Sequence, residues 1–195
     1  TGNNDIKVSL DKTAVTLAAG KNIMLKATVN PVNAGSVSWA SSDNKVATVV
    51  NGKVTAKKAG TAKITAAVGT KSAVCTVTVV SLSKTKLTLG VKEKITLKVN
   101  GTKKKVTWTT SNKKVATVTN GKIVAKKANK KAITITAKVD GVSLTCKVTV
   151  KAAPKKLILK SKKTITVKKK KTAKIKVSLP KNTAGTLKYK TSNKK

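Results

Sequence analysis

The sequence predicts an all-β chain made of tandem β-sandwich domains, and three observations support this prediction. The chain of 195 residues repeats itself, since residues 42–59 and 111–128 are identical at 13 of 18 positions. Val, Ile and Thr alternate with polar residues over short runs, which is typical of half-buried antiparallel strands. Asn-Gly pairs separate these runs, as in tight hairpin turns. No window shows helical spacing of comparable strength.

The repeat extends beyond this phrase and sets the expected domain boundaries. Residues 36–49 (SVSWASSDNKVATV) correspond to KVTWTTSNKKVATV further on, and both copies end in a strand with one cysteine, SAVCTVTV and SLTCKVTV. A third copy begins at KTITVKKKKTAKIKV and reaches TLKYKTSNKK. Such self-similarity indicates repeated structural units. We expect a first domain over residues 1–80, a second over 81–151 and an incomplete third over 152–195.

Each repeat supplies the same series of strands. The opening pair is TAVTLAAGKNIMLKATV in the first repeat and TKLTLGVKEKITLKV in the second. Short strands then flank the turns Asn51-Gly52 and Asn120-Gly121, and the later runs, such as AITITAKV (132–139), again alternate. In the third copy, AKIKVSL (173–179) also places its apolar residues on one face. About seven short strands per repeat suit a small β-sandwich.

The charge of the chain indicates the class of its partners. All 44 basic residues are Lys, five acids oppose them, and the net charge is +39. Such a charge predicts attraction to polyanions or to an anionic surface. Because Arg is absent, the chain lacks the two-pronged contacts that read phosphate and base geometry, whereas Lys offers a hydrated point charge. We therefore expect diffuse attraction without sequence-specific nucleic-acid binding. The alternative is that Lys only covers the solvent-facing sides of the strands.

The positive charge per residue rises along the chain. Residues 1–80 hold 10 Lys and 3 acids, residues 81–151 hold 18 Lys and 2 acids, and residues 152–195 hold 16 Lys and no acid. The run at residues 168–171 falls at a turn between two expected strands, so we predict a solvated hairpin tip there. The candidate contacts to an anionic surface are Lys103, Lys104, Lys105, Lys126, Lys127, Lys130, Lys131, Lys168, Lys169, Lys170 and Lys171.

Catalysis is poorly supported by the composition. The chain has no His, scattered acids and one Cys in each full repeat, so acid–base pairs, metal-ligand clusters and Cys/His pairs are absent from the sequence. No Gly-rich phosphate loop occurs. We predict no catalytic residue, no cofactor and no metal. The start TGNNDIKVSL is polar and no apolar run approaches the ~20 residues of a membrane span, so we expect an excised mature segment without a span.

In its ordered motifs the sequence resembles the bacterial immunoglobulin-like domains of group 2, which occur in tandem in bacterial surface proteins such as the intimin and invasin adhesins. The motifs are TLAAG, LKATVNP, VSWASSDNKVATV, NGKVTAKKAGTAKITA and CTVTV in the first repeat, and the second carries its own versions in the same order. The resemblance implies immunoglobulin-like sandwiches arranged as beads on a string, and a place outside the cell. The second repeat departs from the pattern where Ala-Asn-Lys-Lys replaces Ala-Gly-Thr.

The aromatic and cysteine residues are expected to be structural. Trp39, Trp108 and Tyr189 occupy one repeat position, each two residues after an apolar residue on the same face, so we predict core anchors. The alternative is a ring that stacks on sugars or bases. Cys75 and Cys146 also match each other and lie on apolar faces, which predicts buried, unpaired thiols.

We expect a non-catalytic structural and adhesive module that spaces or tethers other domains of the same polypeptide. Its expected partners are anionic cell-wall polymers or a host surface, contacted through lysine, and its location is a bacterial cell surface or the secreted fraction. Two alternatives remain open from the sequence. One is a module that binds a glycan or host receptor, and the other is a non-specific binder of polyanions or nucleic acid.

Overall fold

Strands account for the regular structure of the chain, as the alternating pattern predicts. The computed structural model describes residues 6–161 and 165–190, and these residues contain no helix; accordingly, none of them forms a helix that could cross a membrane. By the packing of their Cα atoms, the residues form two compact units. The first comprises residues 1–83, 98–107 and 136–145, and the second comprises residues 84–97, 108–135 and 146–195.

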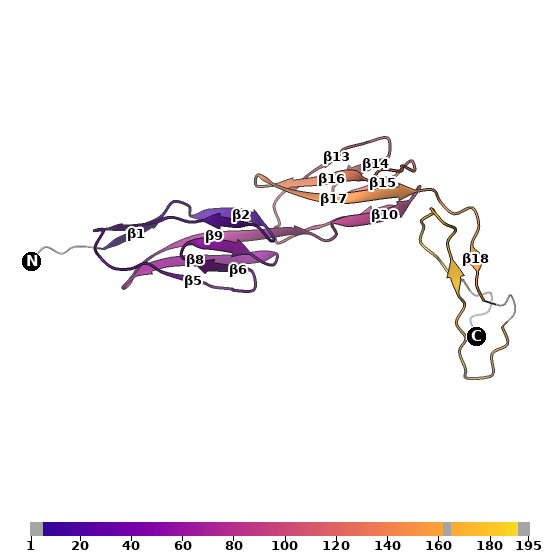
Figure 1. Ribbon diagram of the computed structural model, residues 1–195, viewed down its shortest axis with the longest axis horizontal. Coiled ribbons are helices and arrows are strands. Elements are labelled where there is room, and N and C mark those ends of the chain that lie inside the picture. The colour runs from indigo at the N-terminus through magenta and orange to yellow at the C-terminus, as the bar shows by residue number, and fades with distance from the viewer. Residues whose placement is uncertain (1–5, 162–164, 191–195) are drawn as a thin grey trace, which may run out of the picture. The chain divides into compact units, whose positions relative to one another are not determined.

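The strands of the first repeat, together with β12 of the second repeat, form three sheets (Figure 1). A two-stranded sheet pairs β1 (Lys7–Leu10) with β4 (Ala27–Asn30). A three-stranded sheet has the order β3 (Asn22–Met24), β7 (Lys53–Ala56), β6 (Ala47–Val50). The largest sheet has the order β12 (Val99–Asn100), β9 (Lys71–Leu82), β8 (Gly60–Val68), β5 (Ser38–Ser41), and β2 (Ala14–Ala18) pairs with β9 in parallel.

The second repeat uses the same strand order, so the repeated sequence gives a repeated topology. One sheet has the order β10 (Lys86–Gly90), β17 (Val142–Lys151), β16 (Ile133–Val139), β13 (Thr107–Thr110), and β10 pairs with β17 in parallel as β2 does with β9. A second sheet has the order β11 (Lys94–Thr96), β15 (Lys122–Ala125), β14 (Ala116–Thr119).

Both predicted Asn-Gly hairpins are present. Val50 pairs with Lys53 and Thr119 pairs with Lys122, so each loop has two residues. Asn51 and Gly52 have φ of 47° and 79°, and Asn120 and Gly121 have φ of 48° and 78°. Positive φ at both loop residues is the conformation that matches the twist of the flanking strands, and Asn-Gly is the pair that adopts it most readily.

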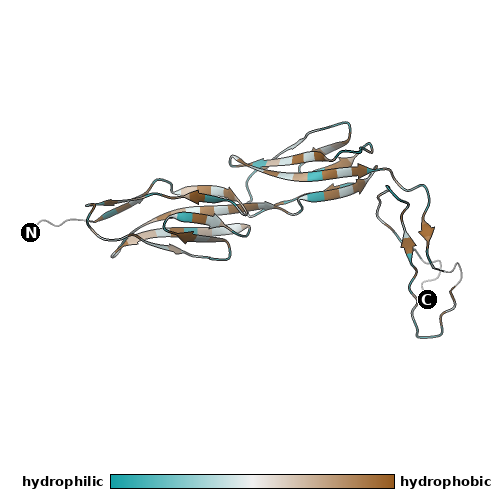
Figure 2. Cartoon of the chain, in the orientation of Figure 1, coloured by the Kyte–Doolittle hydropathy of each residue, from teal (hydrophilic) through white to brown (hydrophobic). Residues whose placement is uncertain are grey.

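The core of the first repeat lies between its larger sheets. Apolar side chains from β7, β8 and β9 meet there, and Val54, Ile64 and Val77 have no exposed surface. The second repeat buries the matching residues, among them Ile123 and Ile135. Figure 2 shows hydrophobic and hydrophilic bands alternating along these strands. No polar or charged side chain is buried among the described residues, so the lysines lie on the outward faces.

The third copy forms much less structure than its sequence predicts. Its strands are β18 (Ile158–Leu159) and β19 (Val177–Ser178), which pair with each other, and Ala152 forms a bridge with Thr183. The expected strand over residues 173–179 is therefore wrong except at two positions, and Ile175 is 59% exposed. No described residue after Val150 is buried. The described part of this copy has no strands matching β16 and β17 that would cover its apolar residues.

Candidate functional site

The lysine-covered surface is the outstanding chemical feature of the chain. Every described lysine is exposed, apart from Lys151, which is partly exposed. All eleven lysines predicted to contact an anionic surface are among the exposed ones. Three of them, at positions 103–105, belong to the first unit, and the other eight belong to the second. The run at 168–171 forms the predicted turn, in which the N–H of Lys171 donates to the carbonyl of Lys168 at 3.0 Å and Lys170 has a φ of 61°.

The four described acids serve as hydrogen-bond acceptors. Asp11 accepts from the N–H of Lys26 at 2.9 Å and Asp43 accepts from that of Lys45 at 2.8 Å. Asp11 also forms an ion pair with Lys12 at 2.9 Å, and this hydrogen-bonded Lys12 ammonium is the main reason the pKa of Asp11 is lowered. Neither acid is placed to act with a second carboxylate, and the described residues contain no group of three metal-ligating side chains.

The other two acids join segments that are distant in sequence. The Glu93 carboxylate accepts from the N–H of Gly90 at 2.7 Å, and its second oxygen accepts from the N–H and hydroxyl of Thr186 at 2.6 and 2.8 Å. The Gly90 contact is the main cause of the lowered pKa of Glu93. Asp140 accepts from the Thr16 hydroxyl at 3.0 Å and pairs with Lys104 at 2.9 Å, and Lys104 is the main cause of its lowered pKa.

The tryptophans lie against the hairpin glycines. Trp39 is half-buried and packs on the core of the first repeat. A Cβ built on Gly52 would lie 3.2 Å from its ring and 2.5 Å from the carbonyl oxygen of Leu25. Trp108 has the same relation to Gly121, at 3.1 Å. Both rings are half-buried, which does not favour a role for them in stacking on a glycan.

Tyr189 corrects the third prediction of a core anchor. Its side chain is 65% exposed. Trp39 lies on β5, which pairs with β8, and that strand closes one side of the core. No described strand pairs with the segment around Tyr189, so nothing covers its ring. The environment of this repeat position therefore differs in the third copy.

The cysteines are free thiols within the sandwich cores. Cys75 and Cys146 are 0% exposed. Burial raises the pKa of both thiols, which favours the protonated, unreactive form.

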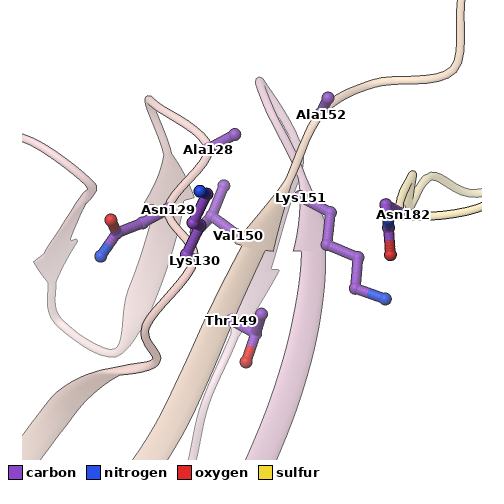
Figure 3. A pocket seen from close by; sticks show the side chains of 8 residues that line it. All are labelled: Ala128, Asn129, Lys130, Thr149, Val150, Lys151, Ala152 and Asn182. Carbon is purple, nitrogen blue, oxygen red and sulfur yellow. The ribbon is translucent and has the colours of Figure 1, made fainter.

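Two pockets lie at corresponding places in the two units. The first unit has a pocket of about 740 Å³ lined by strand residues Thr61 and Thr78 and by the loop at residues 101–104. The second unit has a pocket of about 540 Å³. It is lined by Ala128, Asn129, Lys130, Thr149, Val150, Lys151, Ala152 and Asn182 (Figure 3). Residues 130 and 149 match 61 and 78 in the repeat alignment.

The comparison with protein families identifies the repeat. Residues 7–79 match the family described as bacterial Ig-like domain (group 2). The first repeat is a bacterial Ig-like domain. This confirms the resemblance drawn from its motifs. An uncharacterized protein of Clostridium acetobutylicum is 37% identical over 122 residues, which is 54% of this chain and 13% of that protein. The chain thus spans a small part of this curated relative.

Solved structures also match most of the chain, at low identity and with TM-scores below 0.5. The S-layer protein rSbsC(31-844) is 21% identical with a TM-score of 0.34, over 80% of this chain and 29% of that one. A C-terminal 282-residue fragment of intimin, solved with the intimin-binding domain of the translocated intimin receptor, is 17% identical with a TM-score of 0.42. That likeness covers 79% of this chain and 66% of the fragment.

Sequence reasoning missed the pockets of the two units. Thr61, Thr78 and Lys151 were not singled out, because a pocket needs the loop of residues 101–104 or Asn182 next to the strand ends. One signal was available in the sequence. The replacement of Ala-Gly-Thr by Ala-Asn-Lys-Lys, noted as a departure from the family pattern, places Lys130 in the second pocket.

Proposed function

We propose that the chain is a non-catalytic structural and adhesive part of a bacterial cell-surface or secreted protein. Its repeats, over residues 1–80 and 81–151 with an incomplete third over 152–195, space or tether other domains of the polypeptide. Its lysines hold anionic surfaces, either cell-wall polymers or a host surface. The observation that carries this proposal is the separation of charge. The described lysines lie outside, none of the charged side chains that the structure describes is buried, and the net charge is +39.

Electrostatics explains why this arrangement would adhere. Lysines spread over several faces produce a long-range attraction to any polyanionic layer. Solvent-exposed charges are screened by salt, with a Debye length of about 10 Å at 0.1 M ionic strength. Adhesion through lysine therefore has to weaken as salt is added. The family membership of residues 7–79 supports the structural part of the proposal.

Binding to purified bacterial cell walls tests this proposal. We expect the whole chain to be retained at about 0.05 M salt and released at about 0.5 M, because the Debye length falls more than threefold over this range. Walls stripped of their phosphate polymers are the matched control and should retain less protein. Retention that does not change with salt, or no retention at low salt, would contradict the proposal.

A further inference from the structure

We propose that the two corresponding pockets are binding subsites for a phosphodiester-linked polyol polymer, one subsite in each compact unit. This inference rests on the proposed adhesion to anionic polymers and gives it defined sites. The starting observation is that each of the two units has a pocket at the same place in the repeat. A purely diffuse attraction does not require that coincidence.

The backbone that frames the two pockets is the same. In the first unit Gly60 pairs with Val79 on neighbouring strands, next to the pocket residues Thr61 and Thr78. In the second unit the N–H of Asn129 donates to the carbonyl of Val150 at 2.9 Å, beside Lys130 and Thr149. Thr78 and Thr149 both lie on the strand that carries the buried cysteine, three residues after it. Each unit thus presents a threonine at the same position of that strand.

A loop completes each pocket and approaches the strand closely. In the first unit, Gly101 has a φ of 90°, and a Cβ built on it would collide with the Val79 carbonyl oxygen. Any side chain there would push the loop away from the strand. The glycine therefore holds Thr102, Lys103 and Lys104 at the pocket wall. In the second unit, Asn182 lines the pocket in the way that the loop at residues 101–104 does in the first.

The lining chemistry fits an anion with hydroxyl groups around it. Lys103, Lys130 and Lys151 have no ion-pair partner among the described residues, so their ammonium groups are available to a ligand. Lys104 is already paired with Asp140. Threonine hydroxyls and asparagine amides beside the ammonium groups can bond both phosphate oxygens and polyol hydroxyls. In Figure 3, Lys151 extends on the side of Asn182, away from Asn129.

The same lining argues against nucleic acid as the ligand. Single-strand binders combine a basic groove with aromatic side chains on which bases stack. No aromatic residue lines either pocket, and Arg is absent from the chain. A polyol phosphate needs no stacking platform and places a charge at a regular interval, which suits binding sites lined by lysine and hydroxyl groups.

Two variants of equal charge test the subsites. The pocket variant replaces Lys103, Lys130 and Lys151 by Gln, and the control variant replaces Lys53, Lys94 and Lys122, which are exposed and lie outside both pockets. Binding of poly(glycerol phosphate) to the whole chain is measured by titration calorimetry. We expect the pocket variant to lose about tenfold or more in affinity, because contacts between charged groups are the stronger hydrogen bonds, and the control to lose less than about twofold.

The possible outcomes separate this inference from the proposed function. Equal losses in both variants would overturn the subsites and leave diffuse adhesion standing. No binding by the unaltered chain would overturn the adhesion itself, and the subsites with it. Single-stranded DNA with the same number of phosphates is the second probe. If the pocket variant also loses tenfold in affinity for this DNA, the assignment of a polyol polymer as the ligand is rejected. Thermal unfolding of both variants verifies that they remain folded.

Discussion

Single residues of the repeated phrase determine how each hairpin closes. Gly52 lies beneath the Trp39 ring, and its carbonyl accepts the N–H of Leu25 at 2.9 Å. Gly121 makes the same bond to Leu97 at 2.8 Å. A side chain at either glycine would collide with the leucine carbonyl. The motif NGK occurs in both repeats because its glycine forms the turn, contacts the indole ring and bonds to the neighbouring leucine.

A pair of glycine substitutions separates backbone strain from close contact. Gly20 and Gly52 have nearly the same φ, 82° and 79°, but a Cβ on Gly20 would meet nothing within 4 Å. We expect Gly20→Ala to cost about 1–2 kcal/mol from the left-handed conformation alone. Gly52→Ala should cost at least about 2 kcal/mol more. Urea unfolding measures both, and equal losses would contradict the role assigned to the contact.

The thiols offer a second test at this scale. Cys75 and Cys146 are buried, and their raised pKa keeps them protonated. We expect iodoacetamide at mildly alkaline pH to label neither residue in the folded chain and both in denaturant, as detected by mass spectrometry. Rapid labelling of the native protein at either position would show that its sandwich opens or is packed differently.

Among the elements, the central strands of the larger sheet stabilise each repeat. Ile64 on β8 has no exposed surface, whereas Val50 at the end of β6 is 69% exposed. Ile64→Ala should therefore destabilise the first repeat by about 3 kcal/mol, since it leaves a cavity in a packed core. Val50→Ala should change stability by less than about 0.5 kcal/mol. Similar losses in chemical denaturation would mean that the core lies elsewhere.

The sequence was sufficient for most elements where strands pair locally. The period of two located the strands of both full repeats, and Asn-Gly located their hairpins. The period of two was less accurate at VATV (46–49). The chain is still in a turn at Val46, so the neighbouring residues Val46 and Ala47 are both buried, whereas strict alternation would bury only one of them. The strand prediction was also wrong for most of the third copy. Alternation indicates a segment that could pair within a sheet and bury one face, but it does not show that partner strands are present.

The candidate site was less predictable for a related reason. Lysines could be assigned to outward faces from alternation alone, but the pockets need loop residues that approach a strand distant in sequence. Gly101, through its close approach to Val79, helps to bring Lys103 to the pocket that Thr78 also lines. Contacts of this kind depend on three-dimensional packing, which a period of two does not encode.

On the scale of the whole chain, the few acids link segments and make these links sensitive to pH. The pKa of Glu93 is lowered from its ordinary value of 4.5, chiefly by the Gly90 N–H. Its contribution to stability is complete above that value and is lost as the pH falls through the lowered one. The amide shifts of Gly90 and Thr186 should therefore titrate together, with a midpoint below 4.5.

The matched control for this titration is Glu93→Gln. In that variant neither amide should show an acid transition, because the side chain that accepts from both N–H groups no longer ionises. NMR spectra recorded between neutral pH and about pH 2 measure both midpoints. Separate midpoints, or a common midpoint at or above the ordinary value, would show that the carboxylate does not hold the two segments together.

Acetylation of the lysines tests the central claim, that lysine covers the sandwiches without being part of their cores and provides the adhesion. The reaction removes the positive charges of all 44 lysines. Wall binding and far-ultraviolet circular dichroism are then measured on the same sample. We predict that the β-sheet spectrum is retained while binding at low salt is lost. Undiminished binding by the acetylated chain would contradict this account.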